Sequence, residues 1–513
     1  MTLYVVGLDG AEPSLLRRWA DEGHLPAFSR LFESGASGGL ETTLPPITFP
    51  AWKCYSTGKT PGKLGVYEWF AFDAAGPSIE TNDSADFRSR EYWDVLADAG
   101  YRPATVNMPT THPPNTDDGV LCVAGSPASE RETFTKPESL KDELLDAVPE
   151  YRVKPDLVVG EASADELVAE AKTLVDQRFD TAEWLAEEKN ADPVHFTVFV
   201  TDTVQHRLWD RPKRLREMYE RVDERLGVLL DDPDATVVCM SDHGFTEIET
   251  GFYPNQWLVE RGDLVVGSDT TKGALAQLGL TRERLKRVVD SLGLVNVAQA
   301  LVPESAQRFF PSESGRTAVQ DAPIDWSETK AISLGRGPIY LNDRAFANQT
   351  ERESYRTDLR SELESLTTPD GTPVAEAVHD PDTFYSGTCP RGPDLLVEYT
   401  EGVDAPESVG GEVFGNNSDW LATHRRTGLF AATGEEIATG DAELSIYDVA
   451  PTLLHLLGEP VPEDVDGDVR FDVLDGAASE REEEVGPPSA TDVGGERAGE
   501  EVEETLRNLG YVE

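Results

Sequence analysis

Short apolar runs that alternate with amphipathic helical segments are the feature that most limits how this chain can fold. Three of the runs are rich in β-branched and aromatic residues: LYVVGL at 3–8, HFTVFV at 195–200 and ATVVCM at 235–240. Between them, 162–189 and 214–230 repeat apolar residues at helical spacing. Strand, helix and strand in succession predict an α/β fold whose mainly parallel central sheet has helices on both faces.

Each of these runs leads, within two residues, into side chains of the types that bind metal ions. Asp9 follows the first run, Asp202 the second, and Asp242 with His243 the third. Parallel strands end at a common edge of the sheet, where open α/β folds build their sites. We therefore expect these side chains to lie close together.

Two histidines extend this set. His206 lies four residues after Asp202, so a helix there would place both side chains on one face, with Cβ atoms about 5–6 Å apart. His424 lies in SDWLATHRRTG, after another apolar stretch. Carboxylates and imidazoles together are the ligands of two-metal phosphoryl-transfer centres. The set predicts hydrolytic chemistry on a phosphate ester.

Each residue taken alone also fits a simpler role. Asp9 could cap the helix that follows it. His206 could be an ordinary helix residue, and His424 an exposed loop residue. The chain has only eight histidines, and three of them join three aspartates in this set, which favours the metal site over coincidence.

These segments resemble the alkaline phosphatase superfamily, in particular its type I phosphodiesterase and nucleotide pyrophosphatase branch and related phosphohydrolases. The resemblance covers most of 1–475. It includes PPITFPAWKCYSTGKTPGKLGVYEW, VNMPTTHPP, FYPNQWLVERGDL, GPIYLND and IYDVAPTLLHLLGEPVPEDVDG. It implies a hydrolase that passes through a phospho-threonine and uses two divalent metal ions, zinc or, in the same mixed site, manganese.

The resemblance also implies a role for each site residue. Thr48 would be the nucleophile, although by itself it reads as a turn residue between prolines. One metal would be held by Asp9, Asp242 and His243 and would also bind the Thr48 oxygen. The second metal would be held by Asp202, His206 and His424.

Two further residues are candidates for substrate binding. Lys53 could bind phosphate or could be a surface charge on the helix after Thr48, and Asn107 could line the pocket. The chain departs from its relatives at Leu64, where many have His, and after Pro50, where the pyrophosphatase pattern often has Asn. Nucleotide specificity therefore stays open, as does the group that carries the phosphate.

Three other functions compete with this interpretation. A phosphomutase of the same superfamily would share the metal ligands, but it typically uses Ser and carries a large inserted domain after the nucleophile. A sulfatase needs a Cys or Ser that is converted to formylglycine, which excludes Thr48. A metal-stabilised scaffold protein without activity is the third alternative, and the complete set of competent ligands argues against it.

Composition limits the partners and the compartment. Asp and Glu outnumber Lys and Arg by 96 to 45, for a formal net charge of -51. Such a surface suits a halophile's cytoplasm and would repel nucleic acid and anionic membranes, so neither is predicted as a partner. The four cysteines lack paired spacing, and neither a signal peptide nor a membrane span is predicted.

The domain organisation follows from where the strand and helix alternation is interrupted. We predict a catalytic core formed by 1–261 and 334–475, with 262–333 as an inserted cap. Residues 476–513 are rich in charge, Gly and Pro and are predicted to be a largely disordered acidic tail.

Overall fold

The computed structural model describes residues 2–74, 76–87, 89–157, 159, 162–267, 316–387, 392–415 and 420–489. Its core is a sheet of ten strands. These are β1 (Thr2–Leu8), β2 (Ala36–Glu41), β5 (Ala104–Val106), β6 (Leu121–Val123), β7 (Thr135–Lys136), β8 (Val194–Val198), β9 (Ala235–Met240), β19 (Thr427–Thr433), β20 (Gly440–Asp441) and β21 (Leu444–Ser445).

The strand order is β20-β2-β19-β9-β1-β8-β5-β6-β7, with β21 also beside β2. Strands β9, β1, β8, β5 and β6 are parallel, whereas β19 runs antiparallel to both β9 and β2 and β7 antiparallel to β6. The prediction of a mainly parallel central sheet is confirmed. The antiparallel strand β19, inserted between β9 and β2, was not foreseen from the sequence.

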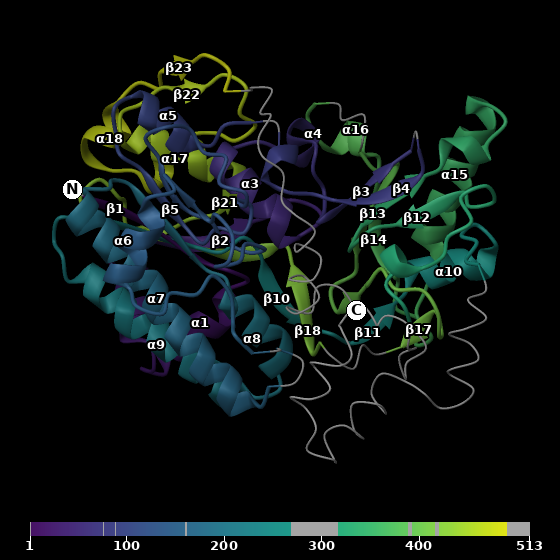
Figure 1. Cartoon of the computed structure of the whole chain (residues 1–513), viewed down its shortest axis with the longest axis horizontal. Coiled ribbons are helices and arrows are strands. Elements are labelled where there is room, and N and C mark those ends of the chain that lie inside the picture. Colours follow the sequence, from purple (N-terminus) through teal and green to yellow (C-terminus); the bar gives the residue numbers. More distant parts are fainter. Residues whose placement is uncertain are drawn as a thin grey trace.

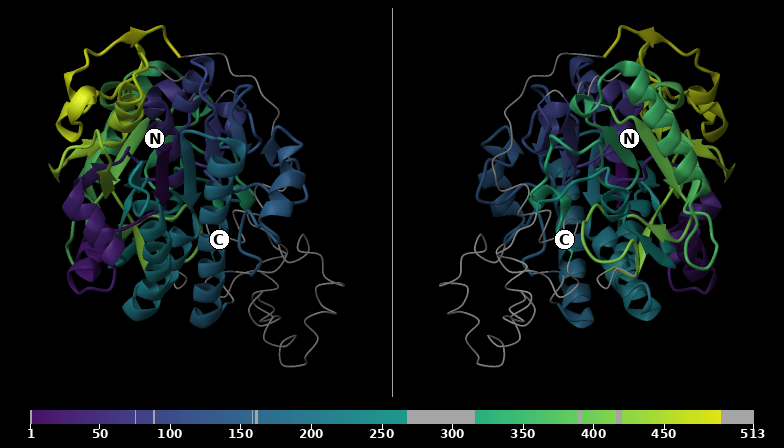
Figure 2. Two further views of the ribbon diagram at one scale, coloured as in Figure 1. Left: turned by 90° about the vertical axis from the view of Figure 1, so that its left-hand side faces the viewer. Right: turned by 90° about the vertical axis from the view of Figure 1, so that its right-hand side faces the viewer.

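Side chains alternate between the two faces along each strand, and both faces of this sheet carry apolar residues that helices cover. Along β1, Leu3 and Val5 join one apolar cluster, while Val6 and Leu8 join the other. The first cluster lies under α3 (Thr48–Thr57), α5 (Tyr92–Asp98) and α17 (Val449–Leu456). The second lies under α1 (Pro13–Asp21), α2 (Pro26–Ser34), α6 (Leu140–Ala147), α7 (Ala164–Lys189), α8 (Val200–Leu208) and α9 (Pro212–Leu230). Helices α7 and α9 run side by side along the outside (Figures 1 and 2).

A second, antiparallel sheet of four strands lies beside the core, on the right in Figure 1. Its order is β12 (Ala331–Ser333), β13 (Pro338–Leu341), β15 (Leu395–Tyr399) and β14 (Ala375–His379). Helices α10 (Pro254–Arg261) and α15 (Gln349–Ser365) belong to this part. The apolar residues of this sheet continue the first cluster of the core, which joins the two parts.

Several short elements lie outside the two main sheets. They are β3 (Phe70–Asp73) with β4 (Ser78–Thr81), β10 (Gly244–Glu247) with β18 (Ala422–Arg425), β11 (Thr250–Phe252) with β16 (Val403–Asp404) and β17 (Phe414–Gly415), α4 (Pro61–Leu64) and α16 (Pro381–Phe384).

The expected cap boundary at 333/334 falls inside a hairpin. Strand β12, on the cap side of that boundary, pairs with β13 on the core side, because their alternating apolar residues share one buried face. On the other side, the Val265 N–H donates to Thr329 Oγ1 at 3.0 Å, and the Asp325 N–H donates to the Val265 carbonyl at 2.8 Å. Val266 and Ile324 form a short antiparallel bridge beside these bonds. The rest of the expected cap, 268–315, lies outside the described residues.

The beginning of the expected tail is folded. Helix α18 (Gly476–Glu480) is capped by Asp475 and buries Ala478, and β23 (Val485–Gly486) pairs with β22 (Val461–Pro462). Ser489 is buried against Lys59, whose ammonium donates to its hydroxyl at 2.9 Å. These contacts attach 476–489 to the body, so the change from core to tail does not come at residue 476. The remainder, 490–513, lies outside the described residues.

Two further expectations concern cysteines and membranes. Cys54, Cys122 and Cys239 are free thiols in the buried core, as their scattered spacing predicts. Among the described helices, none combines the length and apolar character that a membrane crossing requires.

Candidate metal centre

Three neighbouring parallel strands bring the carboxylates together. Strands β8, β1 and β9 lie side by side, and their carboxyl ends lead into Asp202, Asp9 and Asp242 respectively. Helix α8 follows β8 directly, so Asp202 and His206 lie one turn apart on the same face, with 3.3 Å between Oδ1 and Nε2. The predicted helical pair is therefore confirmed.

His424 reaches the same edge by a different route. It lies inside the short strand β18, opposite Phe245 of β10, rather than at the end of an apolar run. Because β10 begins directly after Asp242 and His243, this antiparallel pairing carries His424 to the ends of the parallel strands. Its side chain is only 2% exposed, which excludes the alternative of an exposed loop residue.

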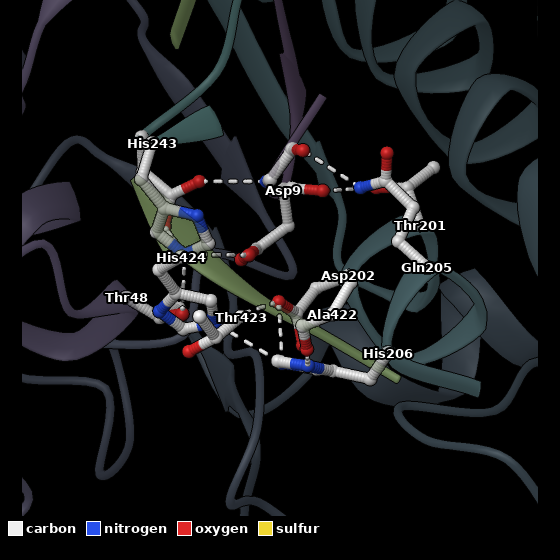
Figure 3. A network of polar contacts seen from close by, with 12 residues as sticks. Asp9, Thr48, Thr201, Asp202, Gln205, His206, His243, Ala422, Thr423 and His424 are labelled. Carbon is white, nitrogen blue, oxygen red and sulfur yellow. Dashed lines mark hydrogen bonds and ion pairs between the residues drawn. The ribbon is translucent and has the colours of Figure 1, made fainter. Parts of the chain in front are cut away.

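The six side chains form two buried groups in which the ligand atoms lie within 4.8 Å of one another. The first metal group contains Asp9, Asp242 and His243, and the second metal group contains Asp202, His206 and His424. The rings of His243 and His424 are stacked at 3.7 Å and connect the groups. Figure 3 shows five of these side chains converging, with Thr48 beside His243; the five are Asp9, Asp202, His206, His243 and His424.

The three histidines all present the same ring nitrogen to the centre. Each Nδ1 lies within hydrogen-bond distance of a main-chain carbonyl, which can only accept, so Nδ1 holds the proton and Nε2 a lone pair. The carbonyls are those of Ala422 for His206 (2.7 Å), Pro46 for His424 (2.8 Å) and Gly244 for His243 (3.2 Å). The Nε2 atoms of His206 and His424 are then two acceptors 3.1 Å apart, an arrangement that a shared cation satisfies.

The carboxylates show the same need for positive charge. Among the described residues, no hydrogen-bond donor reaches Asp9 Oδ1 or Asp242 Oδ2, although both atoms are buried. Burial, followed by repulsion from neighbouring carboxylates, raises the pKa of Asp9 and of Asp242 well above the ordinary value. A divalent cation bound by oxygen and nitrogen ligands would remove this repulsion.

The charges of the remaining ligands also fit a metal. Burial opposes ionisation of Asp202, but His206 and His424, when their rings are protonated, outweigh it and hold the pKa of that carboxyl well below its usual range. Burial lowers the pKa of His243 and of His424, which keeps both rings neutral and able to coordinate. The predicted ligand set is thus brought together completely and in a state suited to divalent metal ions.

Thr48 is the first residue of α3 and points into the centre. Its Oγ1 lies 3.1 Å from His243 Nε2, and the residue is fully buried. Helix α3 has no side-chain cap, and the N–H groups of Thr48 and Phe49 make no hydrogen bond among the described residues. Pro50, at the third position, has no N–H to satisfy. Two main-chain donors at a helix N-terminus therefore remain available to an anion beside Thr48.

Trp52 links α3 to the first metal group and was not singled out in the sequence. Its Nε1 donates to Asp9 Oδ2 at 2.8 Å. Gly7 permits this approach, because a Cβ there would lie 2.5 Å from Trp52 Cη2. Asp9 does not cap α1, whose first turn is capped by Glu12 instead. The bond from Trp52 fixes the orientation of Asp9.

Replacing Trp52 with Phe should therefore weaken the first metal group. We expect metal affinity to fall about 10-fold or more, because the carboxylate loses the donor that orients it. Trp93→Phe is the matched control, since Trp93 is also buried but its Nε1 has no hydrogen-bond partner among the described residues. Metal content during dialysis against graded metal buffers measures the effect. Equal losses in both variants would show that packing, not this bond, is responsible.

Neither predicted substrate-binding residue faces the centre. Lys53 is buried, pairs with Glu91 and lies over the Phe87 ring, so it is not a surface charge and its ammonium is already neutralised. Asn107 is buried; with its amide oriented to satisfy both atoms, it donates to Val153 O at 3.1 Å and accepts from Arg178 Nε at 3.0 Å. The polar groups of both residues are thus engaged by other residues of the protein.

Two recesses adjoin His424 where the core meets the second sheet. The larger has a volume of about 320 Å³, and its wall includes Pro46, Thr423, His424 and Arg336. The smaller, about 10 Å³, includes Ile47, His424 and Arg336 in its wall and has room for one water molecule. Arg336 was not singled out in the sequence; its flanking glycines in LGRGP were the available signal.

Comparison with known proteins agrees with this arrangement. The sequence profile of type I phosphodiesterase / nucleotide pyrophosphatase matches residues 3–419. Among curated proteins, none matches the chain.

Several solved structures share the fold. Phosphonoacetate hydrolase from Sinorhizobium meliloti 1021 has a TM-score of 0.57 and 17% identity, over 87% of this chain and 93% of its own. Murine ectonucleotide pyrophosphatase / phosphodiesterase 5 has a TM-score of 0.53 and 14% identity, over 92% and 100%. A variant of the alkaline phosphatase PafA has a TM-score of 0.54 and 13% identity, over 92% and 98%. With the profile match over most of its length, the chain belongs to the type I phosphodiesterase / nucleotide pyrophosphatase family.

Proposed function

We propose that this protein is a metal-dependent phosphohydrolase in which Thr48 is the nucleophile. The observation that carries the proposal is the position of Thr48, at the uncapped start of α3 and 3.1 Å from a histidine of the first metal group. A hydroxyl placed between a buried metal site and free main-chain donors can attack a phosphate held by those donors.

Two divalent metal ions, zinc or manganese, would complete the site. Asp9, Asp242 and His243 would hold one, and Asp202, His206 and His424 would hold the other. When bound, the ions would supply positive charge that activates the Thr48 hydroxyl and stabilises the attacking and leaving oxygens of an in-line displacement. A mixed set of imidazole and carboxylate ligands suits either metal.

The chain's own residues account for the course of the reaction. The N–H groups of Thr48 and Phe49 orient the phosphate, and Thr48 Oγ1 forms a bond to phosphorus as the ester bond breaks. The proton lost by Thr48 is balanced by the one that the departing alkoxide takes up. Water then cleaves the phospho-threonine, so the sum is ester and water to alcohol and phosphate.

The fold supports hydrolysis over phosphomutase activity. Described residues between Thr48 and Asp202 include β5, β6 and β7, which belong to the central sheet. The chain between these two residues is thus used to build the core, whereas a phosphomutase of this superfamily would carry a separate transfer domain there. Burial of all six ligands also favours a metal enzyme over a scaffold protein.

A substrate panel tests the proposal. Purified protein is supplied with zinc or manganese and offered p-nitrophenyl phosphate, bis-p-nitrophenyl phosphate and a nucleotide-sugar pyrophosphate. Nucleotides are included because an inactive Thr-to-Ala variant of the murine relative was solved in complex with AMP. The net charge of -51 supports a salt-rich cytoplasm, so the assay is run in concentrated KCl. Release of alcohol or phosphate is expected; metal-loaded protein that cleaves none of the esters would contradict the proposal.

A further inference from the structure

Arg336 lies on the turn between β12 and β13 and contributes to the wall of both recesses beside His424. We propose that its guanidinium is a substrate-binding group, which contacts a second negatively charged oxygen on the phosphate of the substrate. A phosphate monoester carries this additional charge and a diester does not. The inference deepens the proposed function, because it assigns a preference for monoesters to the same centre.

The guanidinium is held from two sides. Arg336 Nε donates to Asp404 Oδ1 at 2.8 Å, and the same Asp404 oxygen accepts from Thr423 Oγ1 at 2.8 Å. Thr423 is the neighbour of His424 in β18. The Arg336 guanidinium also lies 4.3 Å from the centroid of the Trp420 ring, which stacks on His206 at 3.5 Å. Arg336 is therefore tied to the elements that position two ligands of the second metal group.

The turn itself limits where Arg336 can be. Gly335 has φ +65° and Gly337 has φ +149°, conformations that favour glycine. A Cβ at Gly335 would collide with the buried carboxylate of Glu68. Because the turn is pressed against Glu68 in this way, the side chain of Arg336 starts from a fixed backbone position rather than from a mobile loop.

Most of the hydrogen-bonding capacity of Arg336 is unused. A guanidinium has five N–H donors, and buried donors are normally satisfied. The Arg336 side chain is only 13% exposed, yet among the described residues Asp404 alone forms an ion pair with it, and only Nε donates. Among the described residues, neither terminal nitrogen donates a hydrogen bond, and Arg336 lines both recesses. An arginine fixed at Nε by a carboxylate, with its terminal nitrogens not hydrogen-bonded to the protein, can bind a phosphate oxygen.

The other acids nearby do not form ion pairs with Arg336. Glu68 and Glu407 line the smaller recess and are buried. Burial raises the pKa of Glu68 to about 7 and that of Glu407 above its ordinary value. Partial protonation of Glu68 near neutral pH therefore reduces the negative charge that would otherwise oppose an anion beside Arg336.

The experiment compares Arg336→Gln and Arg336→Lys with the wild type. Inorganic phosphate is titrated calorimetrically into metal-loaded protein, and kcat/KM is measured for p-nitrophenyl phosphate and for methyl p-nitrophenyl phosphate. For Arg336→Gln we expect phosphate affinity and monoester kcat/KM to fall about 10- to 100-fold, as for loss of a charged hydrogen bond, and diester kcat/KM to fall less than about 3-fold. Arg336→Lys should recover part of the loss.

Arg352→Gln is the matched control. Arg352 lies in α15 of the same part of the molecule, is 17% exposed and donates from Nε to Asp343 at 2.7 Å, but it lines neither recess. Unchanged phosphate affinity in Arg336→Gln, or equal losses on both esters, would overturn the inference. If the wild type cleaved neither ester, the proposed function would fail, while the phosphate titration would still decide whether Arg336 binds the anion.

Discussion

Thr48→Ala is expected to abolish turnover, with kcat falling by about 1,000-fold or more, because the variant lacks the hydroxyl that we propose forms the covalent bond to phosphorus. The metal content should stay near two ions per chain, since Asp9, Asp242 and His243 keep their positions on the ends of β1 and β9. Metal analysis of the purified variant and a phosphate-release assay measure the two quantities separately.

Two control variants make this result specific. Thr48→Ser keeps the hydroxyl and should retain measurable activity and form a phosphorylated protein. Thr57→Ala removes another buried hydroxyl of α3, one that donates only within the helix, to Lys53 O at 2.7 Å, and should leave activity close to that of the wild type. Activity that survives in Thr48→Ala would disprove the assignment of the nucleophile.

Removal of the metals should be the second large effect, on activity and on stability together. Six ligands, three of them carboxylates, are buried in one centre. The raised pKa values of Asp9 and Asp242 show that, without cations, the ionised form of both carboxyl groups is unfavourable in the folded protein. Each ion contributes about 4 kcal/mol to folding when its free concentration is 1,000 times its Kd. Chelation should therefore abolish activity and lower Tm.

The measurement is calorimetric unfolding and activity before and after chelation, followed by addition of zinc or manganese. Both activity and Tm should recover. His206→Ala should reduce the effect of added metal on Tm, because the second group loses one ligand. His379→Ala is its control, since His379 pairs with Glu398 at 2.8 Å and belongs to neither group. Full activity in protein shown by elemental analysis to be metal-free would contradict the two-metal centre.

The parts of the site that could be predicted are those encoded by local patterns. Asp9, Asp202 and Asp242 follow predominantly apolar runs, and such runs form parallel strands whose ends share one edge. The spacing of Asp202 and His206 is that of one helical turn, and α8 places them as expected. Lys53 was misjudged because its partner, Glu91, is distant in sequence and leaves no local signal.

Long-range packing decided the rest. Thr48 and the helix after it were identified through resemblance, and the lack of a side-chain cap on that helix became visible only in the structure. The bond from Trp52 to Asp9 depends on a glycine in another element, Gly7. The expected cap boundary, between 333 and 334, separates the two strands of the β12–β13 hairpin. The boundary was placed where the sequence pattern changes, and β12 lies before that change.

The sequence by itself determined which side chains could form the two metal groups, because ligand types, apolar runs and helical spacing are properties of short segments. Only the tertiary structure decided how these side chains are brought together and which others lie beside them. Pairing of β10 with β18 delivers His424, and the β12–β13 turn delivers Arg336, from segments that local patterns do not connect. The free energy that selects these strand pairings comes from burial of apolar residues across the whole core. No single segment therefore predicts which strands pair.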